Sequence, residues 1–106
     1  MAYRVGITRT ARKDLQEIGR YIARDSPGRA RTFVAHLVQE AKRIGDFPRK
    51  GKRVPEKTEY EIRELTVRPY RVIYRIHDED GRIDVLRFWH SARQPPDLDE
   101  VVGGAG

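Results

Sequence analysis

Four basic side chains of this sequence could act together on a phosphate group. They are Arg63, Arg71, His90 and Arg93. A ribonuclease that uses no metal must deprotonate a 2′-hydroxyl, stabilise a phosphorane and protonate the leaving oxygen. Arginines can stabilise the charge, and a histidine or a glutamate such as Glu61 or Glu64 can transfer the protons. If the protein cleaves RNA, these residues are its predicted catalytic set.

The same arginines have a simpler interpretation, which their spacing alone favours: they bind phosphate or an acidic partner without chemistry. For this interpretation the predicted binding residues are Arg63, Arg71, Arg75, Arg87 and Arg93. Because side chains alternate along a strand, Arg71 and Arg75 would share one face of a sheet, with some of the others beside them. We therefore expect a basic sheet face and lean towards a binding protein over an enzyme.

Other chemistry has little support in the residue types. Without cysteine, the chain has no disulfide, no thiolate metal ligand and no cysteine nucleophile. The three histidines, His36, His77 and His90, lie in different expected elements, so no metal site is predicted. Ser91 directly follows His90 and would point to the opposite face of a strand, and no third member of a catalytic triad is evident. We expect neither a metal nor a cofactor.

The charge of the chain indicates an anionic partner. Of the 106 residues, 36% are charged, the net charge is +6, and the pI is about 10.0. A small basic domain attracts nucleic acid or an acidic protein. No apolar run approaches the roughly 20 residues that a membrane span needs, and the beginning lacks the apolar segment of a signal peptide. A cytoplasmic location without membrane contact is therefore expected.

Two amphipathic helices are expected in the first half of the chain. Thr8 suits a helix N-cap, and Ser26 followed by Pro27 would begin a second helix. The apolar residues of both helices recur at helical spacing. They include Ala11, Leu15, Ile18 and Ile22, then Ala30, Phe33, Val34, Leu37, Val38, Ala41 and Ile44. Such an αα-hairpin must lay its apolar face on another layer.

Strand patterns surround this hairpin. They cover residues 3–7, 60–67, 70–76 and 82–90. The apolar phase slips once, which predicts a β-bulge at residues 63–64. The expected fold class is α+β, with an N-terminal strand, a helical hairpin and then a three-stranded antiparallel meander, the helices packed on one face of the sheet. Residues 1–94 would form a single domain, and residues 95–106 a flexible C-terminal tail.

Several segments, taken in order, resemble the ParE/RelE superfamily of small bacterial toxins from type II toxin–antitoxin modules. The resemblance rests on the opening YRVGITRTARKDLQEIGRYI, on Phe47-Pro48 with Gly51, on REL followed by PYRVIYRI, and on the closing HSAR. It extends from Tyr3 to about Arg93, which is nearly the whole chain. Each segment alone is a weak signal, but four at the right spacing are specific.

This resemblance implies a toxin that is neutralised by a cognate antitoxin similar to ParD or RelB. The C-terminal segment of the antitoxin would wrap around the toxin, place apolar side chains in its grooves and neutralise its charge. The residues expected to contact the antitoxin are apolar residues of the helical hairpin. They are Leu15, Ile18, Tyr21, Ile22, Phe33 and Leu37.

The two branches of the superfamily differ in their targets. RelE-like members cut mRNA on the ribosome with basic residues and often a C-terminal tyrosine, whereas ParE-like members inhibit DNA gyrase. Arg71 and Arg93 match arginines that RelE-like enzymes use. However, residues 60–65 contain no lysine where RelE has catalytic lysines, and no tyrosine follows Arg93. The sequence therefore favours a ParE-like gyrase inhibitor; a ribosome-dependent mRNA endonuclease is the alternative, and a non-toxic nucleic-acid-binding module is the second alternative.

Overall fold

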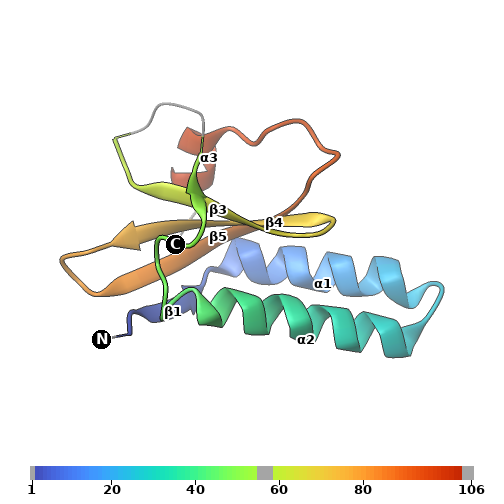
Figure 1. The fold of residues 1–106 in the computed structure, drawn as a ribbon. Coiled ribbons are helices and arrows are strands. Elements are labelled where there is room, and N and C mark those ends of the chain that lie inside the picture. The colour runs from blue at the N-terminus through green and yellow to red at the C-terminus, as the bar shows by residue number, and fades with distance from the viewer. Residues whose placement is uncertain (1, 55–58, 104–106) are drawn as a thin grey trace.

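The computed structural model describes residues 2–54 and 59–103 and has an α+β architecture. A five-stranded sheet with the strand order β1-β5-β4-β3-β2 lies between a helical hairpin and a short C-terminal helix (Figure 1). The elements are β1 (Arg4–Ile7), α1 (Arg9–Ala23), α2 (Pro27–Arg43), β2 (Lys52–Arg53), β3 (Ile62–Val67), β4 (Tyr70–His77), β5 (Arg82–His90) and α3 (Leu98–Gly103). The predicted fold class is confirmed, with α1 and α2 on one face of the sheet. Within the described ranges, no helix is long and apolar enough to cross a membrane.

Capping residues set the starts of both long helices, as predicted. The Thr8 hydroxyl accepts a 3.2 Å hydrogen bond from the backbone N–H of Ala11. The Ser26 hydroxyl accepts one of the same length from Arg29, and Pro27 opens α2 where a backbone N–H has no intrahelical partner. These fixed starting points determine which side chains of the hairpin face the sheet.

The strand β5 is an interior strand, as its apolar residues on both faces predict. It pairs in parallel with β1 and antiparallel with β4. β4 pairs antiparallel with β3, which completes the predicted meander. The sequence pattern gave no sign of β2, because its two basic residues, Lys52 and Arg53, are too few to show any alternation. β2 nevertheless extends the sheet by pairing with β3.

The β-bulge predicted at residues 63–64 is wrong. β3 pairs with β4 in unbroken register, and the register shift lies between β4 and β5, at Ile73/Tyr74. The apolar phase slips along β3 for another reason. Ile62 belongs to a cluster on one face of the sheet, whereas Leu65 packs against a cluster on the other face. Both phases of this strand are therefore partly apolar without any extra residue.

Apolar side chains are buried on both faces of the sheet. The larger cluster fills the space between the helical hairpin and the sheet, and its least exposed members include Leu37, Tyr74 and Val85. A smaller cluster lies on the opposite face. Its buried members are Ile62, Ile73, Trp89 and Leu98. The sheet is thus the middle layer of three.

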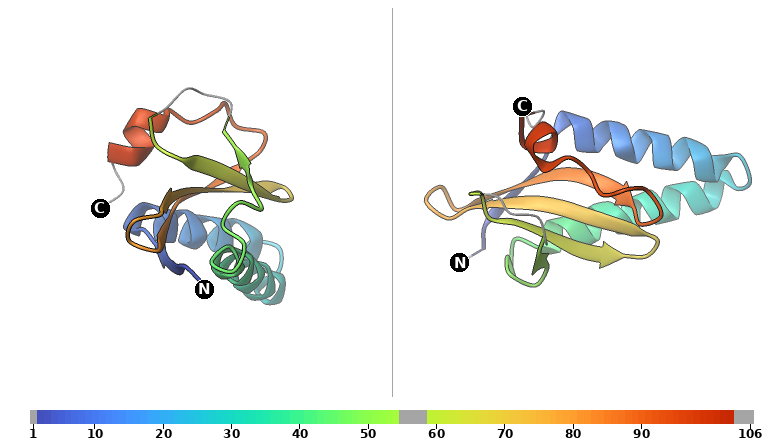
Figure 2. Two further views of the ribbon diagram at one scale, coloured as in Figure 1. Left: turned by 60° about the vertical axis from the view of Figure 1, so that its left-hand side comes forward. Right: turned by 90° about the horizontal axis from the view of Figure 1, so that it is seen from above.

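The C-terminal segment, residues 95–106, was expected to be a flexible tail, and its described part contains a short helix. It forms α3 on the face of the sheet opposite the helical hairpin (Figure 2). Leu98 and Val101 are 7% and 8% exposed. Their spacing of three residues puts both on one side of a helical turn, a signal that the surrounding prolines and acidic residues obscured in the sequence. Residues 104–106 of this segment lie outside the described part of the chain.

Candidate functional site

The sheet face opposite the helical hairpin, here termed the open face, carries basic side chains around the single tryptophan. Arg71 is paired with Trp89 across β4 and β5, and cross-strand partners share a face. The guanidinium of Arg93 lies 3.7 Å from the Trp89 ring centroid, and that of Arg87 lies 4.8 Å from it. The open face therefore brings together three of the arginines that the sequence singled out.

Arg71 is tied to a buried carboxylate. Its Nη1 donates a 2.6 Å hydrogen bond to Oε2 of Glu64, a residue that is only 6% exposed. Nζ of Lys52 lies 3.7 Å from the other carboxylate oxygen of Glu64. A buried carboxylate is destabilising unless cations compensate its charge. Arg71 and Lys52 therefore neutralise Glu64, and a phosphate would have to compete with this carboxylate for them.

The other arginines of the open face differ in how strongly other side chains of the same chain bind them. Arg75 lies 3.9 Å over the ring of Tyr60. Arg87 donates two hydrogen bonds to Asp14, and these bonds raise the pKa of the guanidinium. Arg93 is exposed and stacks on its aromatic neighbour. Of the predicted binding arginines, Arg93 is thus the best placed to meet a partner.

A hollow of about 340 Å³ lies between β5 and α3 beside these residues. Arg87, Trp89 and Arg93 contribute to its lining, and so do the acidic residues Asp97 and Glu100. The carboxylates of the C-terminal segment therefore share this hollow with two of the predicted binding arginines. An anionic ligand entering here would meet both charges, so the hollow alone does not define a phosphate site.

Arg63 and His90 are held away from the open face. Arg63 donates a 2.7 Å hydrogen bond from Nη1 to the carbonyl oxygen of Gly51 and a 2.9 Å bond from Nε to Glu61. The ring of His90 packs edge-on against Tyr70, with 5.1 Å between the ring centroids. Tyr70 belongs to the cluster under the helical hairpin, so His90 lies on that side of the sheet.

The four predicted catalytic residues are consequently not brought together. Arg71 and Arg93 belong to the open face, whereas Arg63 and His90 contact groups on the helical side. Because β3 pairs without a bulge, strict alternation puts Arg63 out of phase with Glu64, the partner of Arg71. In the part of the chain that the structure describes, no group of three or more metal-ligating side chains could hold a metal ion.

Arg63 instead belongs to a network of charges around Arg49. Nη2 of Arg49 donates hydrogen bonds of 2.8 Å to Glu61 and 2.7 Å to Asp78, and the hydroxyl of Tyr3 also donates to Asp78. Burial raises the pKa of Glu61, but the hydrogen bonds from Arg63 and Arg49 outweigh it and hold this pKa below its usual value. The network joins the loop after α2 to the sheet.

A second site lies at the end of the helical hairpin where α1 turns into α2. A hollow of about 1000 Å³, here termed the hairpin groove, opens between this turn, the β3–β4 turn and the end of β5. Its aromatic lining includes Tyr21, Phe33, Tyr70 and His90. Phe33 and Tyr70 are in contact, with ring centroids 5.8 Å apart, and burial raises the pKa of the Tyr70 hydroxyl. Tyr21 is 67% exposed and forms the solvent-accessible side of the groove.

Only half of the six residues that were expected to contact an antitoxin line the hairpin groove. Tyr21, Ile22 and Phe33 line the groove. Leu15, Ile18 and Leu37 do not; they are 9%, 6% and 0% exposed and pack in the cluster between the hairpin and the sheet. These three are not accessible in the free chain, because the middle of each apolar helix stripe covers the sheet and only its edge stays accessible.

Sequence reasoning did not anticipate that Tyr70 and His90 would share the groove with the hairpin. Tyr70 begins β4 and His90 ends β5, and the antiparallel register places them opposite each other. His36 also lines the groove, one helical turn after Thr32. The available signal was the aromatic character of both strand ends, but it becomes useful only when the register is known.

Comparison with known proteins gives a consistent family. The family model of the ParE toxin of the type II toxin–antitoxin system parDE matches residues 5–95. No curated protein matches the chain. Among solved structures, the chromosomal ParDE toxin–antitoxin system from P. aeruginosa is similar, with 24% identity, a TM-score of 0.69, and coverage of 84% of this chain and 96% of the other.

Two further solved structures extend the likeness to RelE proteins. The toxin–antitoxin complex RelBE2 from Mycobacterium tuberculosis has 28% identity and a TM-score of 0.65, and the match covers 85% of this chain and 99% of the other. A mutant of the E. coli toxin RelE in the free state has 19% identity and a TM-score of 0.60, with coverage of 99% and 95%. At 24% and 19% identity, the P. aeruginosa and E. coli structures show a common fold alone.

Proposed function

This chain belongs to the ParE toxin family of type II toxin–antitoxin systems, and from that premise we propose that it inhibits DNA gyrase in the cytoplasm, without chemistry of its own. The separation of the candidate catalytic residues supports this proposal most. Arg63 and His90 contact groups on the helical side of the sheet, whereas Arg71 is paired with Glu64 on the open face. Inhibition by binding needs no such convergence.

The contact with gyrase is assigned to the open face around Arg93. This guanidinium is exposed and is held over the ring of Trp89, which limits its motion before binding. Arginine and tryptophan are the residue types that most often dominate the free energy of a protein interface. Arg71, Arg75 and Arg87 would shape the surrounding electrostatic field while keeping their partners within the chain.

A cognate antitoxin, ParD- or RelB-like, is assigned to the hairpin groove. Two of the similar solved structures are toxin–antitoxin assemblies by description. The groove offers an aromatic wall from Tyr21 and Phe33 and basic residues at its rim, including Arg29 and Arg31. An acidic segment with apolar side chains on one side fits this combination. Binding there would also reach Tyr70 at the base of the groove.

The decisive experiment is a supercoiling assay with purified gyrase and purified toxin. We expect inhibition at micromolar toxin, and a clear loss of inhibition for Arg93→Ala at unchanged thermal stability. Arg24→Ala, which removes an exposed arginine at the C-cap of α1, is the matched control and should inhibit like the wild type. Supercoiling that continues undisturbed at micromolar wild-type toxin would refute the assignment of the target.

One observation favours the mRNA endonuclease as a second candidate. Glu64 and Arg71 place a carboxylate and a guanidinium 2.6 Å apart on one face, the pairing of a proton acceptor with a phosphate-stabilising cation. Induction of the gene without its antitoxin would distinguish the candidates. Arrest of DNA replication first supports gyrase, whereas arrest of translation with mRNA cut inside codons supports the endonuclease. Growth that continues unchanged would instead support a non-toxic nucleic-acid-binding module.

A further inference from the structure

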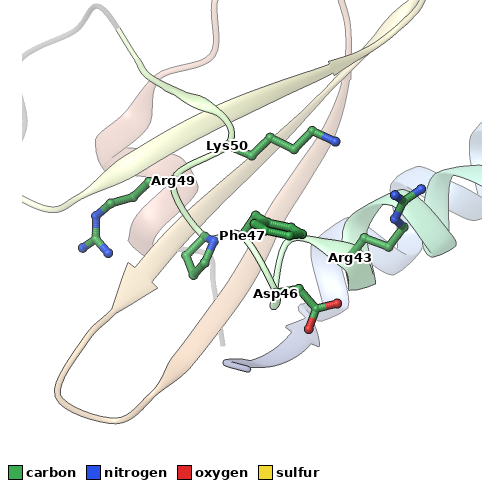
Figure 3. A pocket seen from close by; sticks show the side chains of 6 residues that line it. Arg43, Asp46, Phe47, Arg49 and Lys50 are labelled. Atoms are coloured by element: carbon green, nitrogen blue, oxygen red, sulfur yellow. The ribbon is translucent and has the colours of Figure 1, made fainter. Parts of the chain in front are cut away.

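The turn that follows α2 exposes an aromatic ring among cations. Phe47 is 68% exposed, although it is one of only three phenylalanines in the chain. It borders a hollow of about 650 Å³, here termed the Phe47 surface (Figure 3). The lining consists of Arg43, Asp46, Phe47, Pro48, Arg49 and Lys50. An aromatic ring exposed beside arginine and lysine side chains is a candidate contact for a partner, because aromatic and arginine residues are enriched in protein interfaces.

The backbone of the turn that carries this ring is tightly packed. Gly45 is packed so closely that an added Cβ would lie 2.5 Å from the carbonyl oxygen of Tyr3, and at Gly51 it would lie 2.6 Å from the Tyr74 hydroxyl. That hydroxyl donates to the carbonyl oxygen of Pro48 at 2.7 Å and accepts from the N–H of Gly51 at 3.0 Å. The turn is thus clamped on both sides of Phe47, and little backbone entropy would be lost on binding.

The cations at the Phe47 surface are not equally available. Arg49 points away from the ring (Figure 3) and is engaged with Glu61 and Asp78. Within the described ranges, the ion pair that Arg43 forms is a 3.6 Å contact with Glu40, and its side chain is 63% exposed. Lys50 is exposed as well. Arg43 and Lys50 are therefore the charges that a partner would meet first.

An adjoining hollow extends the Phe47 surface along α2. Its volume is about 600 Å³, and it shares Arg43 and Asp46 with the first. The other lining residues are Ala35, Val38, Gln39 and Lys42. Ala35 and Val38 bring apolar carbon to its floor, and Lys42 adds a third cation. The two hollows together combine an apolar strip with a basic rim.

We propose that the Phe47 surface is a second anchoring site for the antitoxin, which would place a large apolar side chain against Phe47 and carboxylates beside Lys42, Arg43 and Lys50. This inference rests on the proposed neutralisation by an acidic partner and adds where a second part of that partner binds. The complementarity is of charge and of shape, since an apolar ring inside a basic rim suits an acidic amphipathic segment.

Other occupants fit less well. A second copy of this chain would bring the same cations against themselves, at a net charge of +6 for each molecule. Asp46, which lines both hollows, would repel the phosphates of a nucleic acid and the carboxylates of a peptide alike, so the apolar part of the surface distinguishes the two. The apolar strip with Val38 would find no counterpart on a phosphate backbone. An acidic peptide can use the ring, the strip and the cations at once.

The distance between the two anchoring sites is compatible with one partner segment. The hairpin groove takes its residues from the beginning of α2, and the Phe47 surface begins at its end. The 17 residues of α2 span about 25 Å at 1.5 Å per residue. A helical partner of similar length, or an extended segment of roughly 8 residues, reaches from one site to the other. Each site would then raise the effective concentration of the segment at the other.

The test measures the affinity of the toxin for the protein encoded beside its gene, purified as the probe. Phe47→Ser removes the exposed ring without touching the clamp around it, and we expect the Kd to rise about tenfold. Lys42→Glu combined with Lys50→Glu should also raise the Kd and weaken its dependence on salt. Gln16→Ala, at an exposed position of α1, is the control and should bind like the wild type.

Each outcome of this test supports or overturns the assignment of the Phe47 surface to the antitoxin. Unchanged affinity for Phe47→Ser, with an unchanged melting temperature, overturns this inference but leaves the hairpin groove as the antitoxin site. Absence of binding by the wild type overturns the inference together with the proposed neutralisation by this partner, while the gyrase assay still stands on its own. The inference is also wrong if Phe47→Ser leaves the Kd for the probe unchanged but alters another property. Loss of gyrase inhibition, a gained or lost dimer, or loss of nucleic-acid binding would then show that gyrase, a second copy of the chain or nucleic acid occupies this surface.

Discussion

Asp14 of α1 receives two hydrogen bonds from the guanidinium of Arg87, of 2.7 and 2.9 Å, and a third of 3.0 Å from the backbone N–H of Phe88. Beyond Ile7, where β1 ends, no strand among the described residues pairs with β5 on that side. The carboxylate of Asp14 takes the place of the missing strand at this point. It closes the edge of the sheet, anchors α1 and compensates an arginine that the sequence had assigned to a target.

Removing this carboxylate should therefore destabilise the fold. Asp14→Ala leaves the Arg87 guanidinium and the Phe88 N–H without their partner in a part-buried position, and we expect the free energy of unfolding to fall by about 3 kcal/mol. Urea denaturation followed by circular dichroism measures this change. Asp25→Ala, at an exposed position between α1 and α2, should cost less than about 0.5 kcal/mol. Equal effects of the two substitutions would contradict the anchoring role.

The pair of Glu64 and Arg71 allows a second prediction, about coupling. The side chains of Glu64 and Arg71 are 6% and 20% exposed, so the removal of either one leaves the charge of the other poorly compensated. In a double-mutant cycle with Glu64→Gln and Arg71→Ala, we expect a coupling free energy of about 1–2 kcal/mol. The exposed pair of Arg82 and Asp80, at 3.4 Å, is the matched control and should couple by less than about 0.5 kcal/mol.

This cycle bears on the interpretation of toxicity as well. If Arg71→Ala abolishes growth arrest only because it unfolds the protein, Glu64→Gln should restore both stability and toxicity in the double variant. Toxicity that stays lost at restored stability would instead indicate that Arg71 meets the target directly. Measuring melting temperature and growth arrest on the same four proteins separates the two cases.

The network around Arg49 predicts a dependence of stability on acid. The pKa of Glu61 is held below its usual value, because hydrogen bonds from Arg63 and Arg49 outweigh the effect of burial. A lowered pKa in the folded state contributes stability above the ordinary pKa of 4.5, and this contribution is lost as the pH falls through the folded value. The wild type should therefore exceed Glu61→Gln in stability at pH 6, and the difference should shrink below about pH 4.

Urea midpoints at several pH values between neutrality and pH 3 would measure this difference. Glu79→Gln is the control, because Glu79 lies exposed in the β4–β5 turn and has no ion pair within the described chain. Its stability should follow the wild type at every pH. A constant gap between the wild type and Glu61→Gln down to pH 3 would exclude a contribution from the ionised carboxylate.

Local chemistry made much of this fold predictable from the sequence. The hydroxyls of Thr8 and Ser26 fix the helix starts through hydrogen bonds to a residue three positions later. Such short-range interactions can be predicted from the sequence without knowledge of the tertiary structure. The limits of β5 were also predictable, because its apolar run is bounded by turn residues. The family itself followed from the order of several such short segments.

The arrangement of the candidate site was less predictable, because it depends on register and on contacts between distant segments. Arg63 was expected beside Arg71, but the unbroken register of β3 with β4 places the two on opposite faces of the sheet. Arg87 looked like a free cation, since nothing in the sequence connects it with Asp14, which precedes it by 73 residues. Leu15 and Phe33 both belong to apolar helix stripes, and only the packed structure shows that one is core and the other borders a groove.

The contact between α3 and the sheet leads to the last prediction, which uses Trp89 as its own reporter. This residue is the only tryptophan and is 7% exposed, its Nε1 donates a 3.0 Å hydrogen bond to the carbonyl oxygen of Gln94, and it is buried in one cluster with Leu98. Truncation after Gln94 removes α3 and leaves that hydrogen bond possible. We expect a shift of the Trp89 emission to longer wavelength, because water then reaches the ring.

The milder substitution Leu98→Ala should reproduce part of this shift and lower the free energy of unfolding by about 1–2 kcal/mol, since Leu98 is only 7% exposed. Asp99→Ala, at the exposed neighbouring position, should change neither the emission nor the stability. Because α3 covers the open face beside Arg93, the truncated toxin should also inhibit gyrase at lower concentration if that face meets the target. Emission that stays unchanged after truncation would show that α3 does not cover Trp89 in solution.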